Sequence, residues 1–198
     1  MTVWKYSTSG IPDGCFIRGE VPMTKEEVRT VVLSKLRPEN NSIVYDIGAG
    51  TGSLTVEAAN LASQGIVYAI EKNEKGIELI EKNREKFELK NIKVIKGEAP
   101  QSLSDLPRVD RIIIGGSGGN LDSILETAKK KLKDTGRIVI TAVTLETLFQ
   151  AKKHLEKLNF KYEICNITVT RTRQIADYHM LKGMNPVFII SADRGGYR

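Results

Sequence analysis

The sequence predicts an α/β protein whose central sheet is mostly parallel and ends in an antiparallel strand. Short β-branched runs alternate with amphipathic stretches, a glycine-rich turn follows the first complete run, and the last two runs have no evident helix between them. Strands that alternate with helices indicate a parallel sheet with helices on both faces. The chain has 198 residues, which is enough for a single domain with a full core.

The middle of the chain supplies most of the sheet. Runs of Ile and Val predict strands, and apolar residues at helical spacing, such as Leu54, Ala58 and Leu61, predict the helices between them. The expected strands are 43–47, 66–70, 92–95, 111–114 and 138–140, and the expected helices are 53–63, 74–87, 121–130 and 144–158. The apolar side of the last helix is expected to consist of Leu145, Leu148, Phe149 and Leu155.

The two ends of the chain depart from this alternation. Segments 162–170 and 186–191 predict two more strands, and the polar segment of about 15 residues between them holds no evident crossover helix, so we expect them to be antiparallel. Residues 24–36 predict an N-terminal helix, with Thr24 as its N-cap and Glu27 as the Glu of a capping box. We expect one domain over residues 1–198, with an N-terminal extension (1–40) and a core (41–198).

The composition is that of an ordinary globular protein, with 40% apolar and 27% charged residues and a net charge of +6. A mildly basic protein favours acidic partners, but the charge does not choose among them. No apolar run approaches the length of a membrane span, and the start lacks a signal-peptide pattern, so we expect a cytoplasmic protein with no membrane partner. Cys15 and Cys165 belong to no C-x-x-C pair, so we expect no metal bound by the protein.

The strongest functional signal is the turn Asp46-Ile47-Gly48-Ala49-Gly50-Thr51-Gly52, which follows the first strand of the core. In an open α/β sheet, ligands bind beyond the carboxyl ends of the strands, and glycines let the backbone approach them closely. The spacing is G-x-G-x-G rather than the dinucleotide fingerprint G-x-G-x-x-G, and no Walker A lysine follows. Asp46 would repel a pyrophosphate and attract a cation, which favours S-adenosylmethionine (SAM), a ligand with an ammonium and a sulfonium.

Acidic residues also follow the next two strands. Glu71 ends the second strand, where a carboxylate can accept hydrogen bonds from both ribose hydroxyls. Glu98 and Ala99 follow the third strand, where we expect the adenine of the ligand. Taken together, these three strand ends resemble the SAM-dependent methyltransferases of the seven-stranded Rossmann-like class. The resemblance implies a seven-stranded Rossmann-like sheet and SAM as the methyl donor.

The fourth strand is followed by Gly115-Gly116-Ser117-Gly118-Gly119. Many amino-directed nucleic-acid methyltransferases carry Asn/Asp-Pro-Pro-Tyr in this place, so the side chains that clamp a base nitrogen are missing here. The glycines instead leave open space beside the methyl donor. We therefore expect this loop to contact the substrate, and we expect no nucleic-acid partner.

Several blocks of the sequence resemble the precorrin-6B (cobalt-precorrin-6B) C15-methyltransferases (decarboxylating) of the corrin pathway. The blocks are Ile11-Pro12-Asp13 with Phe16-Ile17, Val21-Pro22-Met23-Thr24-Lys25-Glu26-Glu27-Val28-Arg29, the glycine turn, the stretch from Asp110 to Gly119, and Asn185-Pro186-Val187-Phe188. The resemblance implies methyl transfer from SAM to C15 of a corrin precursor and loss of CO2 from its C12 acetate. It also implies a homotetramer, a separate C5-methyltransferase as a functional partner, and SAM contacts from Thr24, residues 48–52, Glu71 and Ala99.

A tetrapyrrole of this pathway carries many carboxylates, and arginine binds carboxylates with two parallel hydrogen bonds. Of the basic residues in the flanks of the chain, we single out Arg29 and Arg171 as candidate substrate ligands. His179 and Tyr178, which are neighbours in the last polar segment, are the candidates for proton delivery. Two alternatives stay open: an RNA or protein methyltransferase of the same fold, and a non-catalytic SAM-binding protein that serves as an assembly partner.

Overall fold

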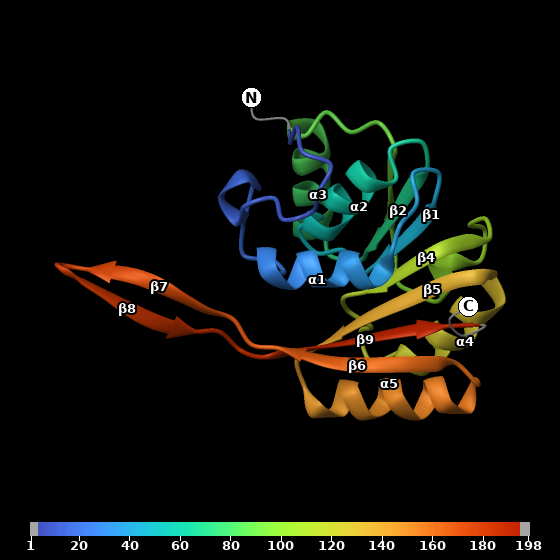
Figure 1. The fold of residues 1–198 in the computed structure, drawn as a ribbon. Helices are drawn as coiled ribbons and strands as arrows, with labels where there is room; N and C mark the ends of the chain where they lie inside the picture. Colours follow the sequence, from blue (N-terminus) through green and yellow to red (C-terminus); the bar gives the residue numbers. More distant parts are fainter. Residues whose placement is uncertain (1–3, 195–198) are drawn as a thin grey trace.

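A computed structural model describes residues 4–194 (Figure 1). Its main sheet has seven strands in the order β3-β2-β1-β4-β5-β9-β6. These are β1 (Ile43–Ile47), β2 (Ile66–Glu71), β3 (Ile92–Lys96), β4 (Val109–Ile114), β5 (Leu132–Ala142), β6 (Lys161–Ile167) and β9 (Val187–Asp193). Strands β1 to β5 are parallel, whereas β9 runs antiparallel to both β5 and β6. The predicted seven-stranded Rossmann-like sheet with its antiparallel last strand is therefore confirmed; the outermost residues of the expected domain, 1–198, lie outside the described part.

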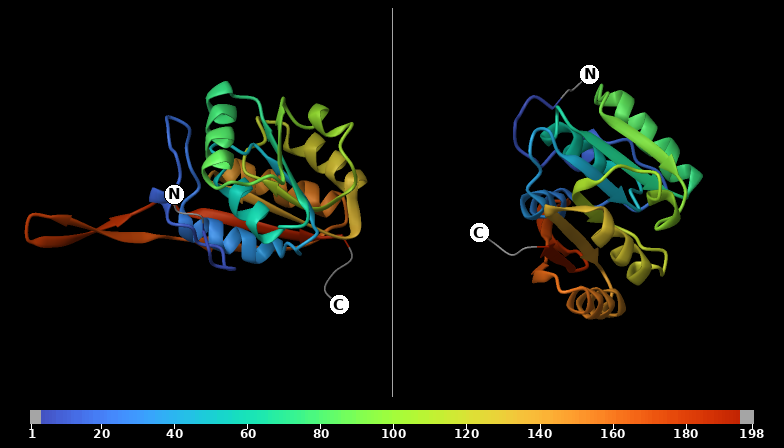
Figure 2. Two further views of the ribbon diagram at one scale, coloured as in Figure 1. Left: turned by 90° about the horizontal axis from the view of Figure 1, so that it is seen from above. Right: turned by 90° about the vertical axis from the view of Figure 1, so that its right-hand side faces the viewer.

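Helices cover both faces of this sheet (Figure 2). They are α1 (Glu26–Leu36), α2 (Ser53–Leu61), α3 (Glu74–Lys86), α4 (Leu121–Lys131) and α5 (Leu145–Lys157), with short 3-10 turns at Asp13–Cys15 and Gln101–Leu103. Successive strand residues point to opposite faces, so Val44 packs among α1, α2 and α3, while Tyr45 packs on the side of α4 and α5. The β-branched runs of the sequence thus become strands buried on both faces, as expected for a parallel sheet.

The segment between β6 and β9 forms a two-stranded arm, which the sequence analysis missed. Strands β7 (Thr170–Ile175) and β8 (Tyr178–Gly183) pair with each other in a separate sheet, and the arm extends away from the body (Figures 1 and 2). The predicted strand 162–170 accordingly ends earlier, at Ile167. Nearly every residue of the arm is exposed, so its sequence lacks the apolar alternation that reveals a strand packed on a core.

The predicted capping of α1 is wrong. The helix begins at Glu26 after Lys25, and no side-chain cap of the usual local kind is formed. The Glu26 N–H instead donates to Asp13 Oδ1 at 3.0 Å, so a carboxylate 13 positions earlier satisfies the start of the helix. The carbonyl of Thr24, the predicted cap, accepts a hydrogen bond from Arg29.

Helix α5 also departs from its prediction. Leu145 and Phe149 were expected on its buried side, but they are 59% and 64% exposed. The prediction holds for Leu155, which is fully buried, and for Leu148, which packs against the core, and Ala151 completes the buried side of the helix. No helix within residues 4–194 is both long and apolar enough to cross a membrane.

Candidate functional site

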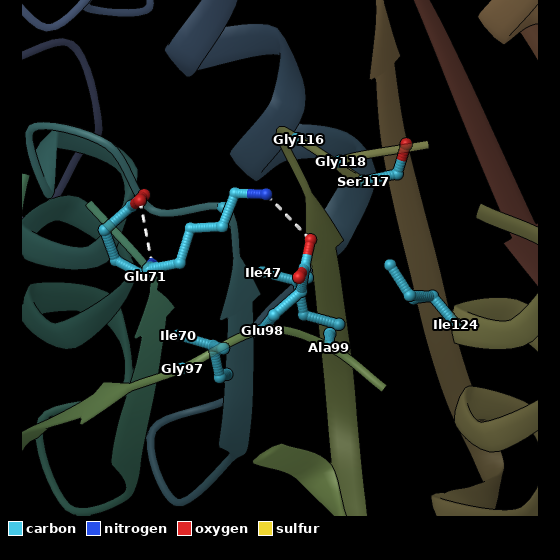
Figure 3. A pocket seen from close by; sticks show the side chains of 12 residues that line it. Ile47, Ile70, Glu71, Gly97, Glu98, Ala99, Gly116, Ser117, Gly118 and Ile124 are labelled. Carbon is cyan, nitrogen blue, oxygen red and sulfur yellow. Dashed lines mark hydrogen bonds and ion pairs between the residues drawn. The ribbon is translucent and has the colours of Figure 1, made fainter. Parts of the chain in front are cut away.

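The glycine turn and the ends of β1 to β4 enclose two neighbouring cavities. The first cavity, of about 190 Å³, lies beyond β1, β2, β3 and β4 (Figure 3). Its lining is Ile47, Gly48, Ile70, Glu71, Lys72, Gly97, Glu98, Ala99, Gly116, Ser117, Gly118 and Ile124. The parallel strands put their carboxyl ends at one edge of the sheet, which is why residues from four separate segments meet here.

Acidic side chains mark the first cavity. The Glu71 carboxylate accepts hydrogen bonds from the backbone N–H groups of Gly50 at 2.8 Å and of Lys72 and Asn73 at 2.9 Å. It therefore fixes the glycine turn while it lines the cavity. Glu98 accepts a hydrogen bond from Lys72 Nζ at 2.8 Å across the cavity (Figure 3). Lys72 was not predicted as a site residue, although it directly follows Glu71, which was.

The second cavity, of about 310 Å³, lies on the other side of the glycine turn. Its walls come from segment 22–25 and α1 on one side and from the base of the arm on the other. Its lining is Pro22, Met23, Thr24, Lys25, Val28, Asp46, Gly48, Ala49, Gly50, Thr51, Ser53, Leu54, Gly115, Thr141, Val143, Val169, Met184, Asn185 and Val187. Gly48 lines both cavities, so a group bound in the first cavity can approach a group bound in the second cavity at Gly48.

Two glycines of the turn need their lack of a side chain for different reasons. Gly48 has a φ of +70°, and a Cβ on it would lie 2.6 Å from the carbonyl oxygen of Gly116, so the turns after β1 and β4 touch through bare backbone. Gly50 has a φ of +57°, but a Cβ there would meet only Val21 and Pro22, at 3.6 Å. The space beside Gly50 therefore belongs to the second cavity rather than to packed protein.

Asp46 lies at the floor of the second cavity and is 1% exposed. Burial raises its pKa to about 6, and the nearby Glu71 charge adds to this, while the hydrogen bond from Thr55 Oγ1, at 2.6 Å, opposes it. Among residues 4–194, no Lys or Arg forms an ion pair with this carboxylate, although buried charges in proteins are normally paired. The described residues thus leave this carboxylate without a cationic partner.

The structure brings together most of the residues that the sequence singles out. The first cavity collects Gly48, Glu71, Glu98, Ala99, Gly116, Ser117 and Gly118, and the second collects Thr24, Asp46, Gly48, Ala49, Gly50, Thr51 and Gly115. Gly52 starts α2 and Gly119 faces open space, and neither lines a cavity. Segment 115–119 therefore contributes to both cavities.

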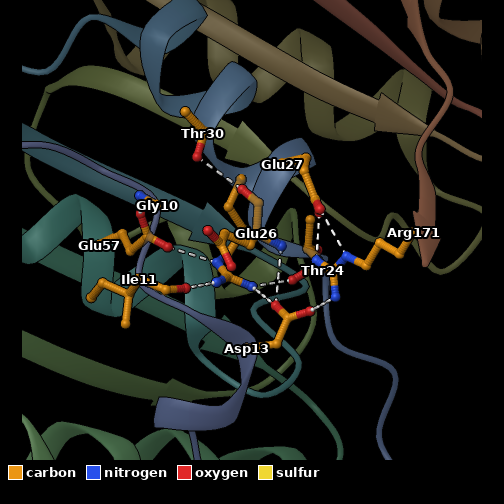
Figure 4. A network of polar contacts seen from close by, with 10 residues as sticks. Gly10, Ile11, Asp13, Thr24, Glu26, Glu27, Thr30, Glu57 and Arg171 are labelled. Atoms are coloured by element: carbon orange, nitrogen blue, oxygen red, sulfur yellow. Dashed lines mark hydrogen bonds and ion pairs between the residues drawn. The ribbon is translucent and has the colours of Figure 1, made fainter. Parts of the chain in front are cut away.

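Arg29 is not a substrate ligand, and the prediction for it is wrong. Its side chain is fully buried and donates to Glu57 at 2.7 Å, to Asp13 at 2.8 Å and to the carbonyls of Thr24 and Ile11 (Figure 4). Every part of the guanidinium is occupied within the protein. Arg29 therefore holds the N-terminal segment against α1 and α2.

Three other predicted contacts, Arg171, Tyr178 and His179, line neither cavity. Arg171, at the start of β7, forms ion pairs with Glu27 and Asp13. Tyr178 and His179 are the first two residues of β8, next to the turn of the arm, and both are exposed. The arm extends away from the body (Figure 1). Within one chain, the arm keeps these two side chains apart from the glycine turn. The base of the arm, by contrast, supplies Val169 and Met184 to the second cavity, which no sequence signal reveals because it depends on the pairing of β7 with β8.

The fold and the site define a class of protein. A seven-stranded sheet in the order 3-2-1-4-5-9-6, with a G-x-G-x-G turn after β1 and a carboxylate at the end of β2, is the arrangement of Rossmann-like methyltransferases. A family model described as a precorrin methyltransferase domain matches residues 15–194. This chain belongs to that family.

Individual relatives agree over the whole chain. The sequence is 42% identical to a probable cobalt-precorrin-6B C(15)-methyltransferase (decarboxylating) of Pyrobaculum calidifontis, over 96% of this chain and 98% of that protein. It is 44% identical to a protein of the same description from Saccharolobus solfataricus, with the same coverage. The crystal structure of a precorrin-6y C5,15-methyltransferase from Geobacter metallireducens matches with a TM-score of 0.90 and 40% identity, over 95% of this chain and 98% of that one.

Proposed function

We propose that this chain transfers a methyl group from SAM to C15 of cobalt-precorrin-6B and removes CO2 from the C12 acetate, in cobalamin biosynthesis. The observation that carries the proposal is the pair of cavities that meet at Gly48, with the unpaired Asp46 carboxylate beside that meeting point. Relatives that are 42% and 44% identical over nearly their full length carry this activity in their names.

The first cavity suits the adenosine part of SAM. Glu71 and Glu98 offer carboxylate oxygens at the ends of β2 and β3, and Ala99 offers a small apolar surface next to them. The glycine turn and Asp46 would hold the cationic end, since a buried carboxylate without a partner favours a positive group. When bound, SAM supplies an electrophilic methyl group on its sulfonium.

The second cavity suits the acceptor beyond the part beside Asp46 and Gly50, where the cationic end of SAM would lie. Its walls are largely apolar, with Met23, Val28 and Leu54 on one side, which fits the faces of a macrocycle, while Lys25 and Asn185 offer polar contacts for peripheral carboxylates. Such walls exclude water and hold the acceptor carbon in line with the methyl donor, which is a large part of what a methyl transfer requires. A poorly hydrated carboxylate also loses CO2 more readily, so the same cavity favours the second reaction.

The alternative of an RNA or protein methyltransferase is tested by offering several acceptors. Methyl-labelled SAM is incubated with the protein together with a tetrapyrrole intermediate fraction, bulk tRNA and a protein extract. We expect label only in the tetrapyrrole. Label in tRNA or protein, with none in the tetrapyrrole, would favour the alternative, and binding of SAM without any transfer would favour a non-catalytic role.

Glu71→Ala should lower the affinity for SAM by roughly tenfold or more, because a charge-assisted hydrogen bond is worth about 1.5–3 kcal/mol. The variant also removes the acceptor of the Gly50 N–H, so the glycine turn loses its anchor. Isothermal titration calorimetry measures the change. Glu74→Ala is the matched control and should bind SAM normally, because Glu74 is an exposed carboxylate at the start of α3 that pairs with Lys96 at the end of β3. Equal affinities for the two variants would make Glu71 a surface acid.

The homotetramer is also part of the proposal. Three exposed apolar side chains of the arm share one face, namely Ile175 (47%), Tyr178 (75%) and Met180 (55%), whereas Leu181 (75%) lies on the other. A two-stranded ribbon alone is marginally stable in water. Another copy of the chain would cover this face. A role for Tyr178 and His179 in proton delivery then requires that the arm reach the site of another copy. The separate C5-methyltransferase partner and the cytoplasmic location remain predictions.

Met180→Asp should therefore convert the tetramer to smaller species, because a charge would be buried in the contact. Analytical ultracentrifugation gives the mass of the assembly. Gln174→Asp puts the same charge on the opposite face of the arm and should leave the assembly intact. A tetramer that survives Met180→Asp would show that this face of the arm is not the interface.

A further inference from the structure

The second cavity has two walls that come from opposite ends of the sequence. One wall is segment 22–25 with Val28 of α1, and the other is the base of the arm, formed by Val169, Met184 and Asn185. The base is tied together by the Met184 N–H, which donates to the Val169 carbonyl at 2.9 Å. Because the two walls belong to different elements, the width of the cavity depends on how the arm is held against α1.

One side chain holds them together. Arg171 lies two residues beyond Val169, and its guanidinium donates to both carboxylate oxygens of Glu27, from Nε at 2.7 Å and from Nη2 at 2.5 Å (Figure 4). Its Nη1 donates to Asp13 Oδ2 at 2.9 Å. Glu27 directly precedes Val28 in α1. We call this group of Arg171, Glu27 and Asp13 the clasp.

Through Asp13, the clasp contacts Arg29 and its buried ion pairs. Asp13 Oδ1 accepts hydrogen bonds from Arg29 and from the Glu26 N–H, so the two oxygens of one carboxylate join the arm to α1 and the core. Arg29 also holds the carbonyl of Thr24, which lines the second cavity. A shift of Arg171 would therefore act on both walls at once.

The clasp is stronger than an ordinary surface ion pair. A two-pronged contact between arginine and a carboxylate fixes geometry as well as charge, and the Arg171 side chain is only 35% exposed. The hydrogen bond from Arg171 lowers the pKa of Glu27. Burial alone would raise the pKa of Asp13, but the hydrogen bonds from Arg29 and Arg171 outweigh it and lower that pKa. Beyond Arg171, every residue of β7 and all of β8 are exposed.

We infer that Arg171 is a positioning residue that sets the second cavity by holding the base of the arm to α1, and that it does not bind the substrate itself. Its Nε, Nη1 and Nη2 atoms are already engaged by two carboxylates of the protein, which leaves no two-pronged face for a carboxylate of the acceptor. The inference rests on the proposed function only in taking the second cavity as the acceptor site.

A double-mutant cycle separates positioning from direct contact. The variants are Arg171→Met, Glu27→Gln and the two combined, and the measurement is kcat/KM for the tetrapyrrole at saturating SAM. If the clasp positions the walls, each single variant lowers kcat/KM by about tenfold, the effect of losing a charge-assisted contact, and the double variant is no worse than either. Arg171→Lys keeps the positive charge but cannot make the two parallel hydrogen bonds of a guanidinium. Its kcat/KM should therefore lie between those of Arg171→Met and the wild type.

Direct contact gives the opposite pattern. Glu27→Gln would then free Arg171 for the acceptor and leave kcat/KM unchanged or higher, while Arg171→Met would raise KM alone; this result, or no effect of either variant, would overturn the inference. Lys153→Met removes a positive charge from the exposed side of α5, away from the arm and the clasp, and should change kcat/KM by less than about twofold.

Hydrogen exchange gives a readout that needs no substrate. The Met184 amide should exchange at least about tenfold faster in Arg171→Met and in Glu27→Gln than in the wild type, because its hydrogen bond closes the base of the arm. Unchanged protection would overturn the inference. If the wild type methylated no tetrapyrrole, the proposed function would fail, and the exchange rates alone would decide whether the clasp holds the cavity walls.

Discussion

Replacing Asp46 by asparagine should make the protein more stable at neutral pH and less able to bind SAM. The carboxylate is buried, Thr55 is the one side chain within residues 4–194 that donates a hydrogen bond to it, and its pKa is raised to about 6. A carboxyl whose pKa is higher in the folded than in the unfolded chain favours folding only while it is protonated. Its contribution is complete below the unfolded value, near pH 4, and is lost as the pH rises through about 6.

The pKa of Asp46 is roughly two units higher in the folded than in the unfolded chain, which corresponds to about 2–3 kcal/mol of the free energy of unfolding at pH 7. Asp46→Asn keeps an oxygen that can accept from Thr55 and removes the buried charge, so the free energy of unfolding at pH 7 should rise by up to about that amount. The gain should shrink toward pH 4, where the wild-type carboxyl is protonated. Urea unfolding at pH 4, 5.5 and 7 measures it. Asp105→Asn, at an exposed position in a turn, is the control and should change little.

The affinity for SAM should move in the opposite direction. A cationic group beside Asp46 stabilises the ionised form, so SAM binding by the wild type should strengthen as the pH rises through about 6. Asp46→Asn should weaken binding at pH 7 by roughly tenfold or more and abolish this pH dependence. A variant that is less stable than the wild type at pH 7, or that binds SAM with unchanged pH dependence, would contradict the assignment of a cation site.

Replacing Gly50 by valine should abolish SAM binding while the fold persists. A Cβ at this position meets the protein only at 3.6 Å, so the added side chain enters the second cavity rather than the core. The left-handed backbone, with its φ of +57°, costs a non-glycine residue about 1–2 kcal/mol, which a domain of this size tolerates. Calorimetric titration with SAM and circular dichroism of the same samples measure binding and folding.

Two further variants distinguish the effect of filling the cavity from the effect of backbone strain on SAM binding. Gly50→Ala carries the same strain but adds only one methyl group, so it should keep a reduced affinity for SAM. Gly14→Val adds a larger side chain where no atom lies within 4 Å and should bind SAM like the wild type. If folded Gly50→Val binds SAM with unchanged affinity, the glycine turn does not contact the ligand.

The sheet and the glycine turn could be predicted because their signals are local. The strand 43–47 is predicted with the bounds that the structure gives to β1, since four of its five residues are apolar or favour strands and the run ends at a turn. Asp46, Glu71 and Glu98 could be placed at one edge because the carboxyl ends of parallel strands must meet there. The order of these residues along the chain was enough to assemble the candidate site.

The flanks could not be predicted in the same way, because their structure depends on partners far apart in the sequence. The charge of Arg29 suggested a substrate ligand, but Asp13 and Glu57, which are 16 and 28 positions away, occupy it completely. The arm was not predicted because its strands are exposed on both faces, so their sequence has no alternation of apolar and polar residues. Asp13, which appeared only as part of a motif, is the residue that joins the start of α1, Arg29 and the arm.

We propose that one site in this chain both methylates a tetrapyrrole and decarboxylates it. The most direct test is to incubate the purified protein with SAM and cobalt-precorrin-6B, and to determine the mass of the product. We expect the wild type to give a product that has gained one methyl group and lost one CO2. Gly50→Val should produce neither change. A product that has gained the methyl group but kept every carboxylate, or substrate that is left unchanged by a wild type that binds SAM, would contradict it.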